Sequence, residues 1–311
     1  MLRRVTLDLT GLPPTPKMVQ AFTKDKRSTD RVFAEVVDQL LASPRHGERW
    51  AQHWLDVIRW AETVGFETNA ERTNAWHYRD WVISAFNRDL PYNQFIRDQL
   101  AGDVTGADAA LGFLVAGPAL QPGQIGRDEE AMRSARQDEL DEVVRTVSQG
   151  LFGLTIGCAR CHDHKFDPIS QVEYYRLFAF FNNADEPRIE APTAEVLARG
   201  AEHGARVKQL ETELSALAKE DAKRKPLEAS LAKLKKARPS AATTLVMAKR
   251  GKPRTTRRFV QGDFTRPAEE MQPGTPSVLH RRAQSDGNRL DFARWVADRN
   301  NPLLARVAVN R

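Results

Sequence analysis

Residues 157–169 read Gly157-Cys158-Ala159-Arg160-Cys161-His162-Asp163-His164-Lys165-Phe166-Asp167-Pro168-Ile169, and this stretch holds both cysteines of the chain and two of its seven histidines. It contains Cys-x-x-Cys-His, the attachment signature of c-type haem. Two thiols at this spacing can form thioethers with the two vinyl groups of one porphyrin, which holds the adjacent imidazole beneath the iron. The motif therefore predicts covalent haem c on Cys158 and Cys161, with His162 as the proximal iron ligand.

The same residues allow other interpretations. Cys158, Cys161 and His164 could supply three ligands of a tetrahedral zinc site, with Asp163 or Asp167 nearby. The two cysteines could also form a redox disulfide or remain a reduced pair. Zinc loses ground because no second cysteine pair is present, and a thioredoxin-like motif loses ground because no βαβ pattern surrounds the cysteines.

Helical periodicity flanks the motif on both sides. A long apolar repeat from Asp128 to Leu154 predicts a helix that runs into the motif, and Ser170 is placed to cap a helix that follows it. Apolar residues recur at three and four positions through most segments before Asn183. We therefore expect a mainly α-helical, cytochrome-like domain over residues 1–190.

Two upstream helices rich in tryptophan offer candidates for a sixth iron ligand. His53 lies one helical turn from Trp50, and His77 lies one helical turn from Trp81, so either imidazole could face the iron while an indole packs on the ring. His53 is favoured because Asp56 could hold its second ring nitrogen. The alternative is a core histidine with no cofactor near it, and the further candidates are His164 and Met132.

The remainder of the chain changes in composition. Residues 191–240 are rich in Ala, Glu, Lys and Leu with heptad-like spacing, which predicts a projecting helical hairpin or coiled-coil insertion. Residues 243–248 and 257–262 are strand-like, residues 266–276 are Pro-rich, and a final helix begins near Leu290. We therefore expect a small β-containing part over residues 241–311.

Composition narrows the classes of partner. The chain has 311 residues, 41% of them hydrophobic and 28% charged, and no apolar run long enough to span a membrane. The formal net charge is +6, but much of the excess lies between Lys208 and Arg258, so we expect no nucleic-acid partner. No charged segment followed by an apolar segment opens the chain, so an export signal would have to lie upstream.

Five stretches resemble the planctomycete secreted cytochrome-like family, which pairs two domains of unknown function and often carries a haem c domain upstream. They are Arg3–Pro16, Gly47–Val57, Tyr78–Ile83, Leu154–Ile169 and Asn301–Arg311. The resemblance implies periplasmic or secreted localisation and a cytochrome-like role. It also implies that residues 241–311 begin a second family domain that is cut short here, and that the electron partner is a redox protein or an upstream haem domain.

Three functions compete at this point. The leading hypothesis is an extracytoplasmic haem c module in electron transfer or haem-based redox chemistry, where a Met or His sixth ligand favours a carrier and an open position favours an enzyme. A second is a zinc-dependent hydrolase or metal-binding protein that uses the Cys/His cluster. A third is a cell-surface scaffold whose aromatic residues bind a polysaccharide. The sequence does not decide whether the protein is an enzyme.

Overall fold

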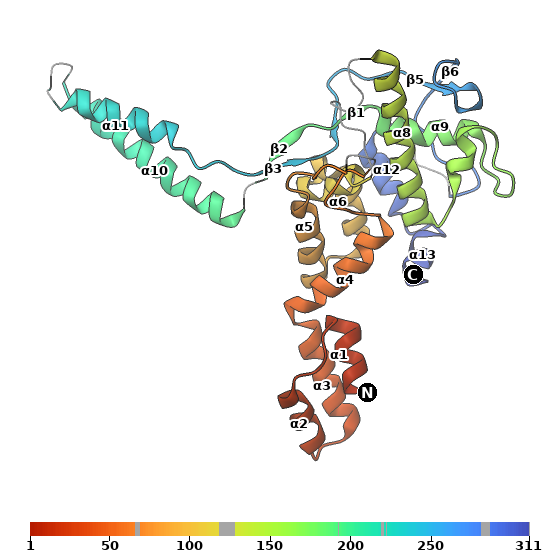
Figure 1. Cartoon of the computed structure of the whole chain (residues 1–311), viewed down its shortest axis with the longest axis horizontal. Helices are drawn as coiled ribbons and strands as arrows, with labels where there is room; N and C mark the ends of the chain where they lie inside the picture. The colour runs from red at the N-terminus through yellow and green to blue at the C-terminus, as the bar shows by residue number, and fades with distance from the viewer. Residues whose placement is uncertain are drawn as a thin grey trace. The chain divides into compact units, whose positions relative to one another are not determined.

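The chain is mainly α-helical, as predicted (Figure 1). The structure, a computed structural model, describes residues 1–65, 69–117, 128–191, 193–218, 221, 223–280 and 287–310. The chain divides into two compact units, of which the first combines Met1–Pro187 with Leu245–Arg311 and the second comprises Arg188–Thr244. The second unit includes the predicted hairpin. The described residues from Leu245 onward belong to the same unit as the N-terminal part of the chain, and the assignment of residues 241–311 as the start of a second family domain stays a prediction.

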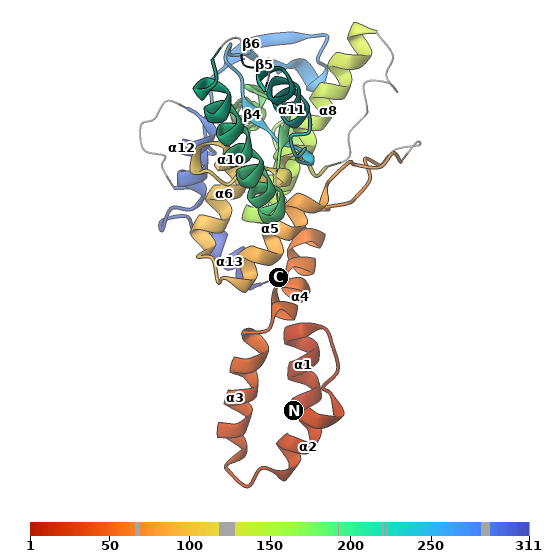
Figure 2. The same cartoon turned by 90° about the vertical axis from the view of Figure 1, so that its left-hand side faces the viewer.

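The first half of unit one is a succession of short helices. They are α1 (Leu2–Thr10), α2 (Pro16–Lys24), α3 (Thr29–Leu41), α4 (Pro44–Val57), α5 (Trp76–Asn87), α6 (Tyr92–Thr105) and the 3-10 helix η1 (Asp108–Val115). Helix α1 packs against α3 and α4, and α4 packs against α5 (Figure 2). The start of the chain is therefore a helix, and its buried residues Leu2 and Thr6 lie one helical turn apart on one face.

Local capping chemistry fixes where several of these helices begin. The Thr15 hydroxyl accepts a hydrogen bond from the Met18 N–H, and Pro16 occupies the first turn of α2. Ser43 caps α4 in the same way, with a proline at the first helical position. A proline there loses nothing, because the first amide groups of a helix have no intrahelical acceptor.

Aromatic residues, among them Trp54, form the core where α4, α5 and α6 meet. The Trp54 indole lies 4.9 Å from the Phe95 ring, and its N–H donates to Gln99 Oε1 at 2.8 Å and to the Tyr78 hydroxyl at 3.0 Å. The Tyr78 hydroxyl also donates to Gln99. These bonds satisfy the polar atoms of three buried side chains, so this cluster contributes to stability rather than forming an open pocket.

The second half of unit one carries the motif. It contains α8 (Glu129–Val147), the π-turn η2 (Ser148–Phe152), the 3-10 turns η3 (Ile156–Arg160) and η4 (Val260–Gly262), and helices α9 (Gln171–Asn182), α12 (Arg289–Val296) and α13 (Leu304–Val309). Strand β1 (Ala184–Asp185) pairs antiparallel with β4 (Ala248–Lys249), and β5 (Thr256–Phe259) pairs antiparallel with β6 (Pro267–Met271). Strand β6 lies within the stretch expected to be only Pro-rich, and Pro267 stands at its first position, where a missing amide donor is tolerated.

Unit two is a pair of helices on a two-stranded base. Helix α10 (Ala194–Ala216) packs against α11 (Arg224–Lys236), and β2 (Arg188–Glu190) pairs with β3 (Thr243–Leu245) (Figure 1). Lys235 forms an ion pair with Glu211, and the His203 imidazole bonds the Leu234 carbonyl. The heptad-like apolar spacing thus forms a helix-to-helix seam, with the charged residues of this unit on its outside.

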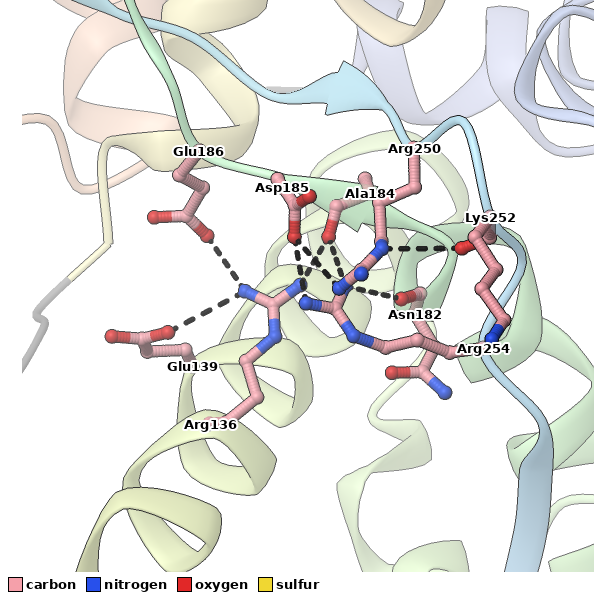
Figure 3. A network of polar contacts seen from close by, with 9 residues as sticks. All are labelled: Arg136, Glu139, Asn182, Ala184, Asp185, Glu186, Arg250, Lys252 and Arg254. Carbon is pink, nitrogen blue, oxygen red and sulfur yellow. Dashed lines mark hydrogen bonds and ion pairs between the residues drawn. The ribbon is translucent and has the colours of Figure 1, made fainter.

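Three arginines hold the segment that follows α9, and we call Arg136, Arg250 and Arg254 the arginine clamp (Figure 3). Arg254 donates to the carbonyls of Asn182 and Ala184 and pairs with Asp185 at 2.6 Å, and Arg250 lies 3.5 Å from the same carboxylate. Two of the basic residues between positions 249 and 258 therefore bind acceptors within the chain itself.

The third member of the clamp lies between two glutamates. Arg136 on α8 donates to the Ala184 carbonyl and pairs with Glu186 at 3.0 Å and with Glu139 at 3.5 Å (Figure 3). Burial raises the pKa of the Glu139 carboxyl to about 7, and the negative charge of Glu186 adds to the shift, whereas Arg136 opposes it. Glu139 is thus partly protonated at neutral pH, unlike an ordinary surface glutamate.

This shift predicts that unit one loses stability as pH rises. The pKa of Glu139 is higher in the folded chain than the usual 4.5, so its contribution is fully present below about pH 4.5 and is lost as pH rises through about 7. The loss is at most about 3 kcal/mol. We expect Glu139→Gln to raise the free energy of unfolding at pH 8 and to change it little at pH 5, measured by urea unfolding. All six tryptophans lie in unit one, so their fluorescence reports this unit.

The matched control is Glu48→Gln, which removes an exposed ion pair with Arg45. It should change the unfolding free energy by less than about 1 kcal/mol at both pH values. An equal effect of Glu139→Gln at pH 5 and pH 8 would contradict the assigned pKa.

Candidate functional site

The Cys-x-x-Cys-His motif lies on a 3-10 turn between α8 and α9. Helix α8 ends at Val147, earlier than expected, and the chain continues through the π-turn η2 to Gly153, whose positive φ of 65° ends the helical path. Gly153 tolerates this left-handed conformation because it lacks a Cβ. Cys158 therefore lies on η3, and Cys161 follows directly after it. The turn η3 packs against both α8 and α9.

One buried carboxylate ties this turn to both helices. Asp141 on α8 accepts a hydrogen bond from the Tyr174 hydroxyl on α9, pairs with Arg145 at 2.7 Å and lies 3.3 Å from the Arg160 guanidinium on η3. Its side chain is 8% exposed. Because a buried carboxylate needs partners for its charge, these three donors from three segments fix the position of the turn.

The network raises the pKa values of two of its members, Arg160 and Tyr174. Burial alone would lower the pKa of Arg160, but the hydrogen bond to Asp138 and the charge of Asp141 raise it above the ordinary value. Burial raises the pKa of the Tyr174 hydroxyl, and the Asp141 carboxylate beside it raises the pKa further. Both groups keep their protons at physiological pH, so both can donate hydrogen bonds to Asp141.

A second set of contacts joins the motif to strand β5, far away in sequence. The Gln171 side-chain amide donates to the Arg160 carbonyl at 2.9 Å and to the Phe259 carbonyl at 3.0 Å. The Tyr175 hydroxyl donates to the same Arg160 carbonyl, and its ring lies 5.4 Å from the Phe259 ring. Residues near β5 therefore complete the frame of the motif, which the sequence alone did not indicate.

The three predicted haem residues are exposed on this frame. Cys158 and Cys161 are exposed free thiols, and His162 follows them on the surface. The His162 Nδ1 atom lies 2.7 Å from the Asp163 carbonyl oxygen. Since a carbonyl only accepts, Nδ1 carries the proton and donates, which leaves the lone pair of Nε2 free.

His164 is used differently, although it lies only two residues away. Its Nδ1 accepts a hydrogen bond from the Asp167 N–H at 2.8 Å and from the Phe166 N–H at 3.3 Å, and its side chain is 7% exposed. The amide nitrogens donate, so the ring proton of a neutral His164 lies on Nε2. His164 shapes the loop of residues 163–169, and a ligand role for it would require these bonds to change.

The other candidate iron ligands lie on upstream helices. His53 is exposed on α4 with its ring 5.6 Å from Trp50, and the described hydrogen bonds include none between His53 and Asp56. His77 is buried on α5 and stacks on Trp76 at 3.6 Å, and burial lowers its pKa. Met132 is exposed on α8. The ring contacts of both histidines are thus with neighbouring tryptophans, and their assignment as ligands stays a prediction.

The described residues contain no ready-made zinc site. Within them, no group of three or more His, Cys, Asp or Glu side chains is placed to hold a metal ion. His164, the third ligand in the zinc interpretation, has its Nδ1 engaged by backbone amides. The haem interpretation and the zinc interpretation of the motif both stay predictions.

A pocket of about 700 Å³ opens elsewhere in unit one. It lies between the end of α6, helix α9, strands β4 to β6 and the start of α12, and Asp103 and Arg289, paired at 2.5 Å, line it. Its lining contains no residue of the motif. The candidate site is therefore an exposed turn and not this pocket.

Among the described residues, no helix combines the length and the apolarity that crossing a membrane requires. Comparison with protein families found that residues 1–186 match the family described as PSCyt2, a protein of unknown function (DUF1549). The matched region includes the whole motif and ends beside the boundary of the first unit. No curated protein and no solved structure matched the chain.

The buried network predicts a large effect of Asp141. We expect Asp141→Ala to lower the free energy of unfolding by about 3 kcal/mol, because it removes the buried acceptor of the Tyr174 hydroxyl and the buried carboxylate that pairs with Arg145 and Arg160. Urea unfolding followed by tryptophan fluorescence measures this.

Asp138→Ala is the matched control, since Asp138 lies one turn earlier on α8 and also pairs with Arg160, but its side chain is 57% exposed. It should cost less than about 1 kcal/mol. Equal losses in the two variants would show that Asp141 does not hold the turn.

Proposed function

The chain belongs to the PSCyt2 family of proteins of unknown function (DUF1549), and from this premise we propose that it attaches haem c at Cys158 and Cys161 and ligates the iron through His162. Its role is electron transfer or haem-based redox chemistry outside the cytoplasm.

The observation that carries this proposal is the hydrogen bond of His162. Histidines that bind metals commonly donate their second ring N–H to a carbonyl or carboxylate, which fixes the tautomer and the ring orientation. The bond from Nδ1 to the Asp163 carbonyl at 2.7 Å has this form, and it leaves Nε2 as the free donor atom. The two thiols that would form the covalent links are exposed and unpaired in the same turn.

The residues of the site divide the work among them. Cys158 and Cys161 would hold the macrocycle covalently, and His162 would ligate the iron through Nε2, while the hydrogen bond from its Nδ1 to the Asp163 carbonyl tunes the basicity of the ring. Asp141 and Gln171 keep the backbone of the turn in place. The haem, when bound, supplies one-electron chemistry at its iron.

The sixth position decides between a carrier and an enzyme. A Met or His ligand favours electron transfer, and an open position favours reaction with a substrate. Met132, His53, His77 and His164 remain the candidates, and ligation through His164 Nδ1 would require its hydrogen bonds from the Phe166 and Asp167 amides to break. A redox protein or an upstream haem domain is the proposed electron partner, and the proposed localisation is periplasmic or secreted.

Expression with the cytochrome c maturation machinery tests the proposal. We expect a haem absorption spectrum that survives denaturing extraction with acid and organic solvent, because thioethers are covalent. The double variant Cys158→Ala with Cys161→Ala should lose the haem that resists extraction and should keep the fold. His162→Ala should retain tethered haem with an altered spectrum, since it removes only the axial ligand.

Absence of covalent haem from the wild-type chain, under conditions where a known c-type cytochrome matures, would reject the proposal. Retention of haem by the double cysteine variant would instead show non-covalent binding at another place.

A further inference from the structure

The turn η4 lies against the second cysteine of the motif. It connects β5 to β6, and its backbone is unusual, because Gln261 has a φ of 55° and Gly262 a φ of 78°. Residues with a Cβ rarely adopt this left-handed conformation, so position 262 favours glycine. The turn belongs to residues 245–311, beyond the part of the chain that matches the family.

Gly262 makes its closest approach at the Cys161 sulfur. A Cβ added at Gly262 would lie 2.7 Å from Cys161 Sγ and 3.4 Å from both the Cγ and the carbonyl oxygen of Arg160. A carbon and a sulfur without a bond between them do not approach to 2.7 Å, so any side chain at this position must displace the sulfur or the turn. The Cys161 thiol is thus held on one side by the backbone of η4.

Other contacts keep η4 in this position. Gln171 bonds the carbonyls of both Arg160 and Phe259, so the residue before Cys161 and the residue before η4 share one amide group. The Arg258 guanidinium donates to Gln171 Oε1 at 2.9 Å and pairs with Glu269 on β6 at 2.7 Å. The motif and the β5–β6 hairpin therefore form one hydrogen-bonded frame around Cys161.

The two thiols differ as a consequence. Both cysteines are exposed, but the Cys161 Sγ has the backbone of Gly262 against one side. On the premise of the proposed function, we propose that the η4 turn is a positioning element for haem attachment, and that Gly262 orients the Cys161 thiol for thioether formation. Gly262 acts through Cys161 and does not itself touch the haem.

The step that depends on this orientation is an addition. The S–H bond of Cys161 breaks, sulfur bonds to the inner carbon of a haem vinyl group, and the hydrogen goes to the terminal carbon of that vinyl. The addition consumes no oxidant or reductant. It requires the sulfur to lie near one vinyl carbon while Cys158 reaches the other, so a displaced Cys161 sulfur should fail selectively.

Gly262→Ala, expressed with the maturation machinery, tests this. We expect haem attached by Cys158 alone, seen as a cleaved peptide in which Cys161 remains a free thiol and as a shifted band of the reduced pyridine complex, because one vinyl group stays unsaturated. The matched control is Gly251→Ala, since a Cβ at Gly251 meets nothing within 4 Å and that glycine has no positive φ. Gly251→Ala should carry two thioethers, like the wild type.

Two thioethers in a folded Gly262→Ala variant would overturn the proposal. A general loss of haem from both cysteines would also overturn it, since the claim is specific to Cys161. Unfolding of the variant is checked by its tryptophan fluorescence.

A haem-free measurement decides the matter if Gly262→Ala does not fold, and it separates this inference from the proposed function. In the wild-type chain without haem, iodoacetamide should alkylate Cys161 severalfold more slowly than Cys158, and urea should abolish the difference. Equal rates in the folded chain would overturn the positioning role. A wild type that takes up no haem but shows the rate difference would reject the proposed function and leave the contact of η4 with Cys161 confirmed.

Discussion

The position of the motif depends on the buried carboxylate of Asp141. It accepts from Tyr174 on α9, and it pairs with Arg145 on its own helix and with Arg160 on η3. Burial makes each of these contacts costly to lose, because an unpaired charge in the interior is strongly unfavourable. The turn that carries the cysteines is therefore held in place by a buried polar network. The two cysteines form no disulfide, and the described residues include no preformed metal centre.

That network separates the rigid and the reactive parts of the motif. The backbone of η3 is held from α8, α9 and β5, whereas the two thiols and the His162 ring face solvent. Two histidines in the same loop take opposite roles because their Nδ1 atoms meet opposite partners. A carbonyl next to His162 leaves its Nε2 lone pair free, and amides next to His164 use that ring to shape the loop.

The basic character of residues 249–258 has a structural explanation in unit one. Arg254 pairs with Asp185, Arg257 with Glu270 and Arg258 with Glu269. The first pair joins the segment before β5 to the exit of α9, which is far away in the chain, and the other two join the two strands of the β5–β6 hairpin. These three arginines are therefore paired with carboxylates of the same unit, although the pairs are partly exposed to solvent.

The sequence by itself determined the mainly helical fold and the residue spacing of the motif, because both are local. The cap of Thr15 on α2 and the capping box of Ser170 on α9 involve residues three positions apart, and the Cys-x-x-Cys-His spacing is local in the same sense. Only the tertiary structure decided that β5 and η4 complete the site, that Gly262 meets Cys161, and that His164 serves the loop. These contacts depend on where distant segments pack, which apolar periodicity and residue spacing do not specify.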